Sequence, residues 1–340
     1  MLLSICIPTY NRASCLRKTL NIWASQIHEG NYEESVEINI SDNGSPDNTQ
    51  DVIHSFKTEN PDIMVSSVRN EANLGPDKNY LRAMHMASGD YSILWSDDDY
   101  LRVGALSFVF DTLKHNPEIN FFISNRTLWR DGEELGYQTF LYPEVSTRVF
   151  DFSDHNQALL YFSSVISLGG LFSYIPAVIY KSEIGRMYDY DGSLDGTFYS
   201  FLFYWWQYLL EGNKLMYLNT SYINCTIDVN NNNFGKNINR TLVDYEGYIK
   251  VADCLGIKGV VRSYFLRCVN SDHTFMQFLD HCILNKDIFY SRLVPAMLKC
   301  GISRSYVDEV ERCSKRRTGV RNIVLSLFPV IHDIYNHFVR

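Results

Sequence analysis

The stretch YSILWSDDDYL, residues 91–101, decides how we interpret the fold. It begins as an apolar run and ends in three adjacent carboxylates, Asp97, Asp98 and Asp99. A short run of aromatic and β-branched residues is typical of a buried strand. Like charges gathered at its end are costly unless a cation compensates them. The stretch therefore predicts a buried strand whose carboxyl end binds a metal ion, with a solvated acidic loop as the alternative.

Apolar runs alternate with amphipathic stretches over the first third of the chain. The other runs are LLSICIP (2–8), VEINIS (36–41), IMVSSV (63–68) and INFFIS (119–124), and the amphipathic stretches cover 13–27, 48–58, 77–88 and 102–115. Strand–helix alternation of this kind predicts an α/β fold with a mostly parallel sheet flanked by helices. In such a sheet, ligands bind beyond the carboxyl ends of the strands.

Composition excludes several classes of protein. The chain has 340 residues and a net charge of −8, which argues against a protein that coats nucleic acid. No window supplies the roughly 18 uninterrupted apolar residues of a membrane span. The 8 cysteines form no CxxC pair, so we expect reduced cysteines in a cytoplasmic protein and no zinc site. There is no GxGxxG, GxxxxGK[ST] or GxSxG motif for a dinucleotide, P-loop or hydrolase site.

Polar residues follow each of the first four predicted strands. Asp42, one residue past its strand, is suited to accept a hydrogen bond from a nucleotide base, although an Asx turn explains it equally well. Oxygen ligands such as Asp98 favour Mg²⁺ or Mn²⁺, which typically bind one or two carboxylates and substrate phosphates. The carboxyl edge of the sheet is therefore predicted to bind a diphosphate through a metal ion.

Four blocks in this order resemble family 2 glycosyltransferases of GT-A fold: IPTYNR (7–12), SDNGSPDNT (41–49), NLGPDKN (73–79) and SGDYSILWSDDD (88–99). Within that family the similarity is greatest to bacterial abequosyltransferase-like enzymes that build O-antigen. The resemblance implies inverting transfer of a sugar, such as the 3,6-dideoxyhexose abequose, from a nucleotide-diphosphate donor. CDP is the favoured nucleotide, and Mn²⁺ or Mg²⁺ the implied cofactor. The implied acceptor is a polyprenyl-diphosphate-linked oligosaccharide at the inner face of the bacterial inner membrane.

The resemblance also implies roles at matching positions. The implied nucleotide-sugar-binding residues are Pro8, Thr9, Asn11, Asp42, Asn43, Lys78 and Asp97, and the implied metal ligand is Asp98. Asp42 would read the base, Lys78 would lie near the ribose or diphosphate, and Asp97 would approach the ribose. Ser96 stands where most relatives carry Asp, so one usual carboxylate is lost and Asp97 would replace it.

The catalytic base is harder to find. Inverting transfer needs a base that deprotonates the acceptor hydroxyl, which in the family is the Asp of a Glu-Asp pair. The matching position here is Ser200-Phe201, which cannot act as a base. The nearest carboxylates lie in MYDYDGSLDGT (187–197), where we expect Asp195, or else Asp191, to be catalytic. The alternative role of Asp195 is to anchor the amino terminus of the next helix.

That helix is expected over FYSFLFYWWQYLL, residues 198–210. Five aromatic residues share one helical face and are expected in the core: Phe198, Phe201, Tyr204, Trp205 and Tyr208. Tyr199 or Trp206, on another face, would then be free to stack on a sugar.

Two regions are predicted. Residues 1–230 form the GT-A domain, with a nucleotide-sugar half (1–99) and an acceptor half (100–230), and residues 231–340 form a helical C-terminal region. Five basic residues near its end have no acid among them: Arg312, Lys315, Arg316, Arg317 and Arg321. An apolar run, 323–331, follows them, which predicts peripheral docking on anionic lipid, with a helix packed on the core as the alternative.

Two other functions use similar residues. A nucleotidyltransferase also combines carboxylates, a metal and an α/β sheet, but it would want a glycine-rich loop after the first strand, where IPTYNR has no glycine. A non-catalytic sugar-nucleotide-binding relative would explain Ser96 and the missing Glu-Asp pair.

Overall fold

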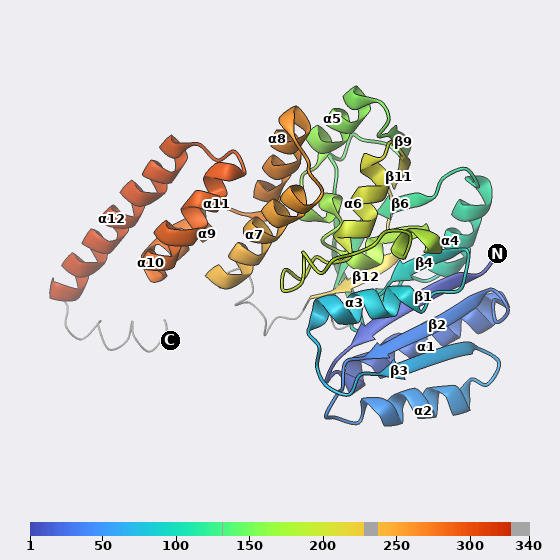
Figure 1. Cartoon of the computed structure of the whole chain (residues 1–340). Helices are drawn as coiled ribbons and strands as arrows, with labels where there is room; N and C mark the ends of the chain where they lie inside the picture. Colours follow the sequence, from blue (N-terminus) through green and yellow to red (C-terminus); the bar gives the residue numbers. More distant parts are fainter. Residues whose placement is uncertain (131, 228–236, 328–340) are drawn as a thin grey trace.

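An eight-stranded sheet forms the centre of the molecule (Figure 1), in the order β3-β2-β1-β4-β10-β6-β11-β9. The computed structural model describes residues 1–130, 132–227 and 237–327, with side chains to residue 317. The strands are β1 (Leu3–Thr9), β2 (Val36–Asp42), β3 (Met64–Arg69), β4 (Tyr91–Leu94), β6 (Phe121–Ser124), β9 (Arg148–Asp151), β10 (Val178–Lys181) and β11 (Lys214–Leu218).

The sheet is mostly parallel, as predicted. β1 pairs in parallel with β2 and β4, and β2 with β3, so four carboxyl ends meet at one edge. β10 enters antiparallel between β4 and β6. All five predicted strands are confirmed, with ends shifted by at most two residues. β9, β10 and β11 were not predicted as separate strands.

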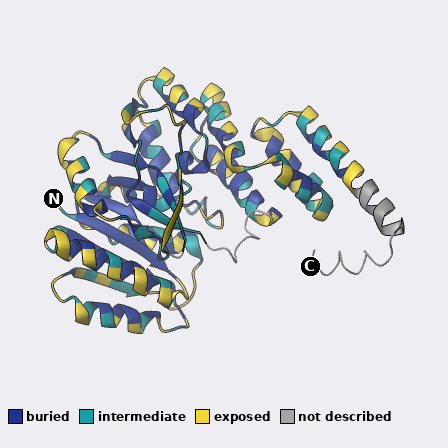
Figure 2. Cartoon of the chain, turned by 180° about the vertical axis from the view of Figure 1, so that it is seen from behind, coloured by how far each residue is buried: buried dark blue, intermediate teal, exposed yellow. Residues whose placement is uncertain are grey.

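Four helices connect the first strands and cover the sheet: α1 (Ala13–Gly30), α2 (Thr49–Glu59), α3 (Pro76–His85) and α4 (Ala105–His115). Their outer faces are exposed, whereas β1, β2 and β4 are buried and the edge strand β3 is only partly buried (Figure 2). In α1, Leu16, Leu20 and Trp23 recur at helical spacing and are buried. The Trp23 ring meets Trp95 edge-on at 5.0 Å, which fixes α1 against the end of β4.

A second, four-stranded sheet has the order β5-β12-β7-β8. It comprises β5 (Tyr100–Leu101), β12 (Ile223–Thr226), β7 (Arg126–Arg130) and β8 (Glu133–Gln138). The sequence analysis missed this sheet because its strands are short and largely polar. β5 begins directly after Asp99, so this sheet starts at the edge where ligands are expected.

The later helices lie mainly to one side of the sheets (Figure 1). They are α5 (His155–Ser164), α6 (Leu202–Leu210), α7 (Ile238–Cys254), α8 (Gly259–Arg267), α9 (Phe275–Leu284), α10 (Lys286–Ile288), α11 (Val294–Lys299) and α12 (Arg304–Leu327). The predicted helical C-terminal region is thereby confirmed, while its predicted start at residue 231 lies outside the described residues. Within the described ranges, no helix has the length and apolar character needed to cross a membrane.

The amino ends of the strands are joined by a buried carboxylate, Glu37 of β2. It accepts hydrogen bonds from the Ser4 hydroxyl, from the hydroxyl and N–H of Ser88, and from Asn39. Burial alone would raise the pKa of Glu37, but these hydrogen bonds outweigh burial and hold the pKa below its usual range. The ionised form of Glu37 therefore stabilises the fold.

Replacing Glu37 by Gln should test this contribution. Because the folded-state pKa lies below the unfolded one, the stabilisation is present above the unfolded pKa, about 4.3, and is lost as the pH falls. We expect Glu37→Gln to lower the free energy of unfolding by about 1–3 kcal/mol at pH 7. The difference from the wild type should shrink towards pH 3, as followed by urea unfolding. The exposed Glu34→Gln is the control, and a difference that does not change with pH would contradict the assignment.

Candidate active site

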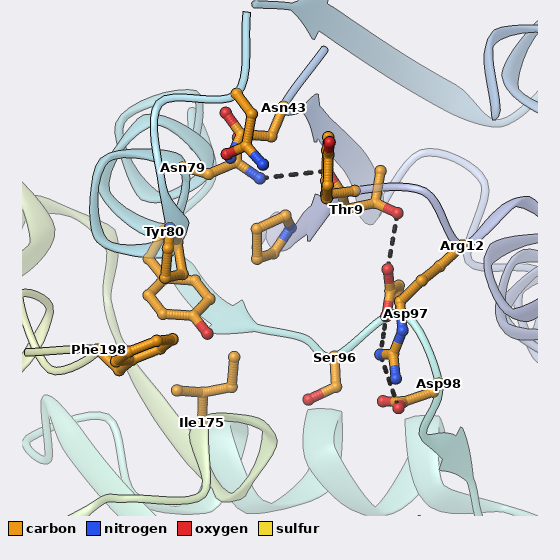
Figure 3. Close-up of a pocket in the computed structure, with 14 residues that line it drawn as sticks. Thr9, Arg12, Asn43, Asn79, Tyr80, Ser96, Asp97, Asp98, Ile175 and Phe198 are labelled. Carbon is orange, nitrogen blue, oxygen red and sulfur yellow. Dashed lines mark hydrogen bonds and ion pairs between the residues drawn. The ribbon is translucent and has the colours of Figure 1, made fainter. Parts of the chain in front are cut away.

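A cavity of about 350 Å³ lies at the carboxyl ends of β1, β2 and β4 (Figure 3). This is the position predicted for ligand binding. Of the predicted site residues, Pro8, Thr9, Asn43, Asp97 and Asp98 line it. Arg12, Asn79, Tyr80, Ile175 and Phe198 line it as well, although the sequence analysis assigned none of them to the site.

The carboxylate of Asp97 is buried and held from two sides. The Thr9 hydroxyl donates to it at 2.7 Å and an Arg12 guanidinium nitrogen at 2.8 Å. Burial raises the pKa of Asp97 to about 6, and the positive charge of Arg12 and the Thr9 hydrogen bond limit the rise. Asp97 thus joins the ends of β1 and β4 and fixes one wall of the cavity.

Arg12 also contacts Asp98, which extends into the cavity. The same guanidinium nitrogen lies 2.7 Å from Asp98, so one cationic group bridges two carboxylates (Figure 3). The Asp98 side chain is 32% exposed. A partly exposed carboxylate at the edge of a cavity is a ligand that suits a hard divalent ion. Asp98 therefore fits Mn²⁺ or Mg²⁺, whereas both oxygens of Asp97 are engaged by Thr9 and Arg12.

Arg12 was not predicted as a site residue, because within its block, IPTYNR, only Pro8, Thr9 and Asn11 were given roles. A basic residue shortly after a strand, when carboxylates follow a neighbouring strand, is the signal that would have identified it.

Asp99 points away from the cavity. Its carboxylate accepts the Tyr174 hydroxyl at 2.9 Å and the Thr226 N–H at 2.8 Å. Burial, together with the nearby charge of Asp98, raises the pKa of Asp99 to about 7. The three adjacent carboxylates are therefore not one cluster: two face the cavity, and the third connects the loop after β4 to the second sheet.

Asp42 is fully buried and does not line the cavity. Its carboxylate accepts the Ser45 N–H and the Gln50 side-chain amide, and it lies 3.6 Å from the Arg69 guanidinium. Both oxygens are thus engaged within the protein. The next residue, Asn43, does line the cavity.

The other predicted residues, Asn11, Lys78, Asp195 and Asp191, are not among those that line the cavity. Asn11 is exposed, with a positive φ of 55°. The exposed Lys78 has its ammonium 3.9 Å from the Asp195 carboxylate. Asp195 accepts the Tyr190 hydroxyl at 3.0 Å and lines a separate hollow against α7. Asp191 is exposed and accepts the Ser193 N–H. The alternative role of Asp195 as a helix anchor is wrong, because α6 begins only at Leu202.

The predicted burial of the aromatic residues before and within α6 is confirmed for Phe201, Tyr204, Trp205 and Tyr208 and is wrong for three others. Trp206 is fully buried and Tyr199 is 2% exposed, whereas Phe198, expected in the core, is 47% exposed. The helical spacing was extended over residues that precede the helix.

A second cavity, of about 520 Å³, adjoins the first. The two share Tyr80, Ser96, Ile175 and Phe198 as lining residues. Asn239 and Arg240 of α7 line the far side of the second cavity. The two cavities are therefore adjacent and share one wall, and α7 of the C-terminal region lines the second of them.

Comparison with known proteins agrees with this geometry. Residues 4–164 match the model of glycosyl transferase family 2. The chain is 28% identical over 337 residues to abequosyltransferase RfbV of Salmonella typhimurium, covering 96% of this chain and 97% of that protein. It is 31% identical over 105 residues to the GalNAc(5)-diNAcBac-PP-undecaprenol beta-1,3-glucosyltransferase of Campylobacter jejuni, covering 31% of this chain and 32% of that protein.

Two solved structures share the fold. Residues 1–349 of TarS from S. aureus superpose with a TM-score of 0.58 at 16% identity, covering 88% of this chain and 80% of that one. The mannosyltransferase PcManGT from Pyrobaculum calidifontis, in complex with GDP-Man and Mn²⁺, superposes with a TM-score of 0.53 at 13% identity. The match covers 92% of this chain and 79% of that one. The fold and the site thus define a glycosyltransferase of GT-A fold. Residues 4–164 carry a glycosyl transferase family 2 domain, and the chain is related over most of its length to an abequosyltransferase.

Proposed function

We propose that this glycosyltransferase is a metal-dependent, inverting enzyme that moves a sugar from a nucleotide-diphosphate donor to a lipid-linked saccharide. The observation that carries the proposal is the pair of carboxylates, Asp97 and Asp98, facing a cavity that opens into a second one. The relation to an abequosyltransferase favours a CDP-activated 3,6-dideoxyhexose as donor and an O-antigen intermediate as acceptor. The undecaprenol in the name of the C. jejuni relative favours a polyprenyl diphosphate carrier.

In this proposal the first cavity binds the donor. Pro8, Thr9 and Asn43 border the nucleotide. Asp42 positions Asn43 by fixing the loop after β2, in place of the direct contact with the base that the resemblance implied. Asp98 would hold Mn²⁺ or Mg²⁺, which when bound neutralises the charge on the leaving diphosphate, and Asp97 would lie near the ribose.

Asp195 remains our proposed base and Asp191 the second candidate. Asp195 directly precedes the loop that brings Phe198 to the junction of the two cavities, whereas Asp191 lies four residues further away along an exposed turn. Tyr190 orients the Asp195 carboxylate, and the exposed Lys78 lies on its other side, where a diphosphate would also contact it.

The alternatives predict different reactions. A nucleotidyltransferase would release pyrophosphate from a nucleoside triphosphate, and the loop after β1 lacks the glycines to hold one. A non-catalytic relative would bind the sugar nucleotide without hydrolysing it. Donor hydrolysis with and without Mn²⁺ therefore separates the proposal from both.

Nucleotide binding should depend on metal through Asp98. We expect one of CDP, UDP, GDP and dTDP, at a hundredfold excess over Kd, to stabilise the wild type by ~2.7 kcal/mol with Mn²⁺ or Mg²⁺ but not with EDTA. Thermal-shift assays measure this. Asp98→Ala should remove the metal-dependent shift and abolish transfer, while the exposed Asp111→Ala leaves both unchanged. A metal-dependent shift that persists in Asp98→Ala would refute the metal assignment.

Asp195→Asn should lower turnover by about a hundredfold or more, because general base catalysis contributes at least that factor. The Asn side chain retains the shape and the contact with Tyr190, so donor binding should be unchanged in the thermal-shift assay. Asp191→Asn is the matched control and should turn over normally. The reverse pattern in the two variants would assign the base to Asp191.

We further propose that the C-terminal region docks on the inner face of the bacterial inner membrane. Three of its basic residues, Arg312, Lys315 and Arg317, pair with Glu309, Glu311 and Asp280, respectively. These pairs are exposed and contribute little, so their charges remain available to anionic lipid. The side chains of Arg321 and the apolar run 323–331 lie outside the described residues.

Vesicle flotation tests the docking proposal. Each basic residue near an anionic surface contributes about 1 kcal/mol, so replacing Arg312, Lys315 and Arg316 by Gln should weaken binding to phosphatidylglycerol vesicles about a hundredfold. Replacing the exposed Arg17 and Lys18 of α1 by Gln should have no such effect. If the wild type binds neutral phosphatidylcholine vesicles as well as it binds phosphatidylglycerol vesicles, or binds neither kind of vesicle, electrostatic docking is excluded.

A further inference from the structure

Phe198 lies where the two cavities meet. Its ring lines both of them, beside Tyr80 and Ile175 (Figure 3), and its side chain is 47% exposed. It thus presents an open aromatic face at the point where donor and acceptor would lie next to each other. The apolar residues Phe201 and Val243 line the second cavity beyond it.

The backbone at Phe198 is strained. Its φ is +68°, a left-handed conformation that bulky L-residues rarely adopt and that only glycine adopts without cost. Such a residue persists only where its surroundings impose the conformation, and it is found disproportionately at ligand sites. A glycine would adopt this conformation without strain. The presence of a phenylalanine instead therefore indicates that its aromatic ring has a function at this position.

One buried carboxylate imposes the conformation. One oxygen of Asp77, in the first turn of α3, accepts the N–H groups of Gly196 at 2.9 Å and Phe198 at 3.0 Å. Its other oxygen accepts the N–H of Ser200 at 3.0 Å, and the Ser200 hydroxyl donates to the Asp77 carbonyl. Asp77 is 3% exposed. These bonds hold a five-residue loop whose central side chain is the exposed ring.

The second cavity also offers polar groups around this ring. Asn239 and Arg240 of α7 line it, and Arg240 is held by an ion pair of 2.7 Å with Asp244. An aromatic face with nearby amide and guanidinium donors suits a pyranose, which has an apolar face of C–H groups and a rim of hydroxyls.

We propose that Phe198 is the platform on which a pyranose ring of the acceptor stacks, and that Asp77 is a positioning residue that holds this platform in place. The proposal rests on the proposed function and specifies its acceptor site. Phe198 contacts substrate, whereas Asp77 acts only through the loop it binds.

Binding of methyl α-D-manno-, galacto- and glucopyranoside, followed by saturation-transfer NMR titration in the presence of CDP and Mn²⁺, tests the platform. We expect at least one glycoside to bind the wild type, and Phe198→Ala to raise its Kd about tenfold. Phe198→Tyr retains the ring and should bind like the wild type. Tyr142→Ala, which removes an aromatic side chain that is 52% exposed outside both cavities, is the matched control.

A double-mutant cycle tests Asp77. Asp77→Asn removes one acceptor oxygen and should also raise the glycoside Kd about tenfold. If Asp77 acts through Phe198, Asp77→Asn combined with Phe198→Ala should bind no more weakly than Phe198→Ala alone. Additive losses would overturn the positioning role, and an unchanged Kd in Phe198→Ala, or no glycoside bound by the wild type, would overturn the platform.

The nucleotide thermal shift tests the proposed donor site independently of the proposed glycoside platform. It is measured with nucleotide and metal alone, on the wild type and on Tyr142→Ala, whose side chain lies outside both cavities. A wild type that shows the metal-dependent shift but binds no glycoside would refute the platform and leave the donor site intact.

Discussion

A buried negative charge, Asp97, determines how the cleft is built. A carboxylate placed among apolar strands must be matched by donors, and Thr9 from the end of β1 and Arg12 from the loop after it provide them. This requirement joins β1 to the loop after β4 and leaves Asp98 facing the cavity. The helix–sheet packing around Trp23 and Trp95 supports the same junction from behind. The first cavity lies between strand ends that this charge pair and the Thr9 hydrogen bond hold together.

The first half of the chain could be predicted from sequence because its signals are local. Buried parallel strands have nearly continuous apolar sequences, and the helices between them repeat at helical spacing, so β1 to β4, β6 and α1 to α4 were predicted, whereas the short strands β5, β7, β8 and β9 were not. The position of the cavity could also be predicted from the topology, because parallel strands bring their carboxyl ends to one edge of the sheet. The metal assignment of Asp98 and the nucleotide assignments of Thr9 and Asn43 stay predictions, although all three residues do line that cavity.

What the sequence did not predict depends on contacts between distant segments. Asp97, Asp98 and Asp99 look equivalent in the sequence, yet Asp99 is drawn away by Tyr174 and Thr226, which no local pattern indicates. Phe198 was expected in the core because helical periodicity was extended into a loop. The loop exists because Asp77 binds its N–H groups, and no periodicity reveals a bond between residues more than a hundred positions apart.

The bond network of Asp77 has a consequence for how acceptor preference changes in evolution. Asp77 lies in the first turn of α3, whereas the loop that it binds, residues 196–200, lies more than a hundred positions further along the chain. The loop is held through its backbone, so its side chains can change as long as three N–H groups return to the same carboxylate. Under the proposed function, this loop is an exchangeable module of the acceptor wall on a constant docking point. Grafting residues 196–200 between relatives would then alter that wall while the bonds to Asp77 are kept.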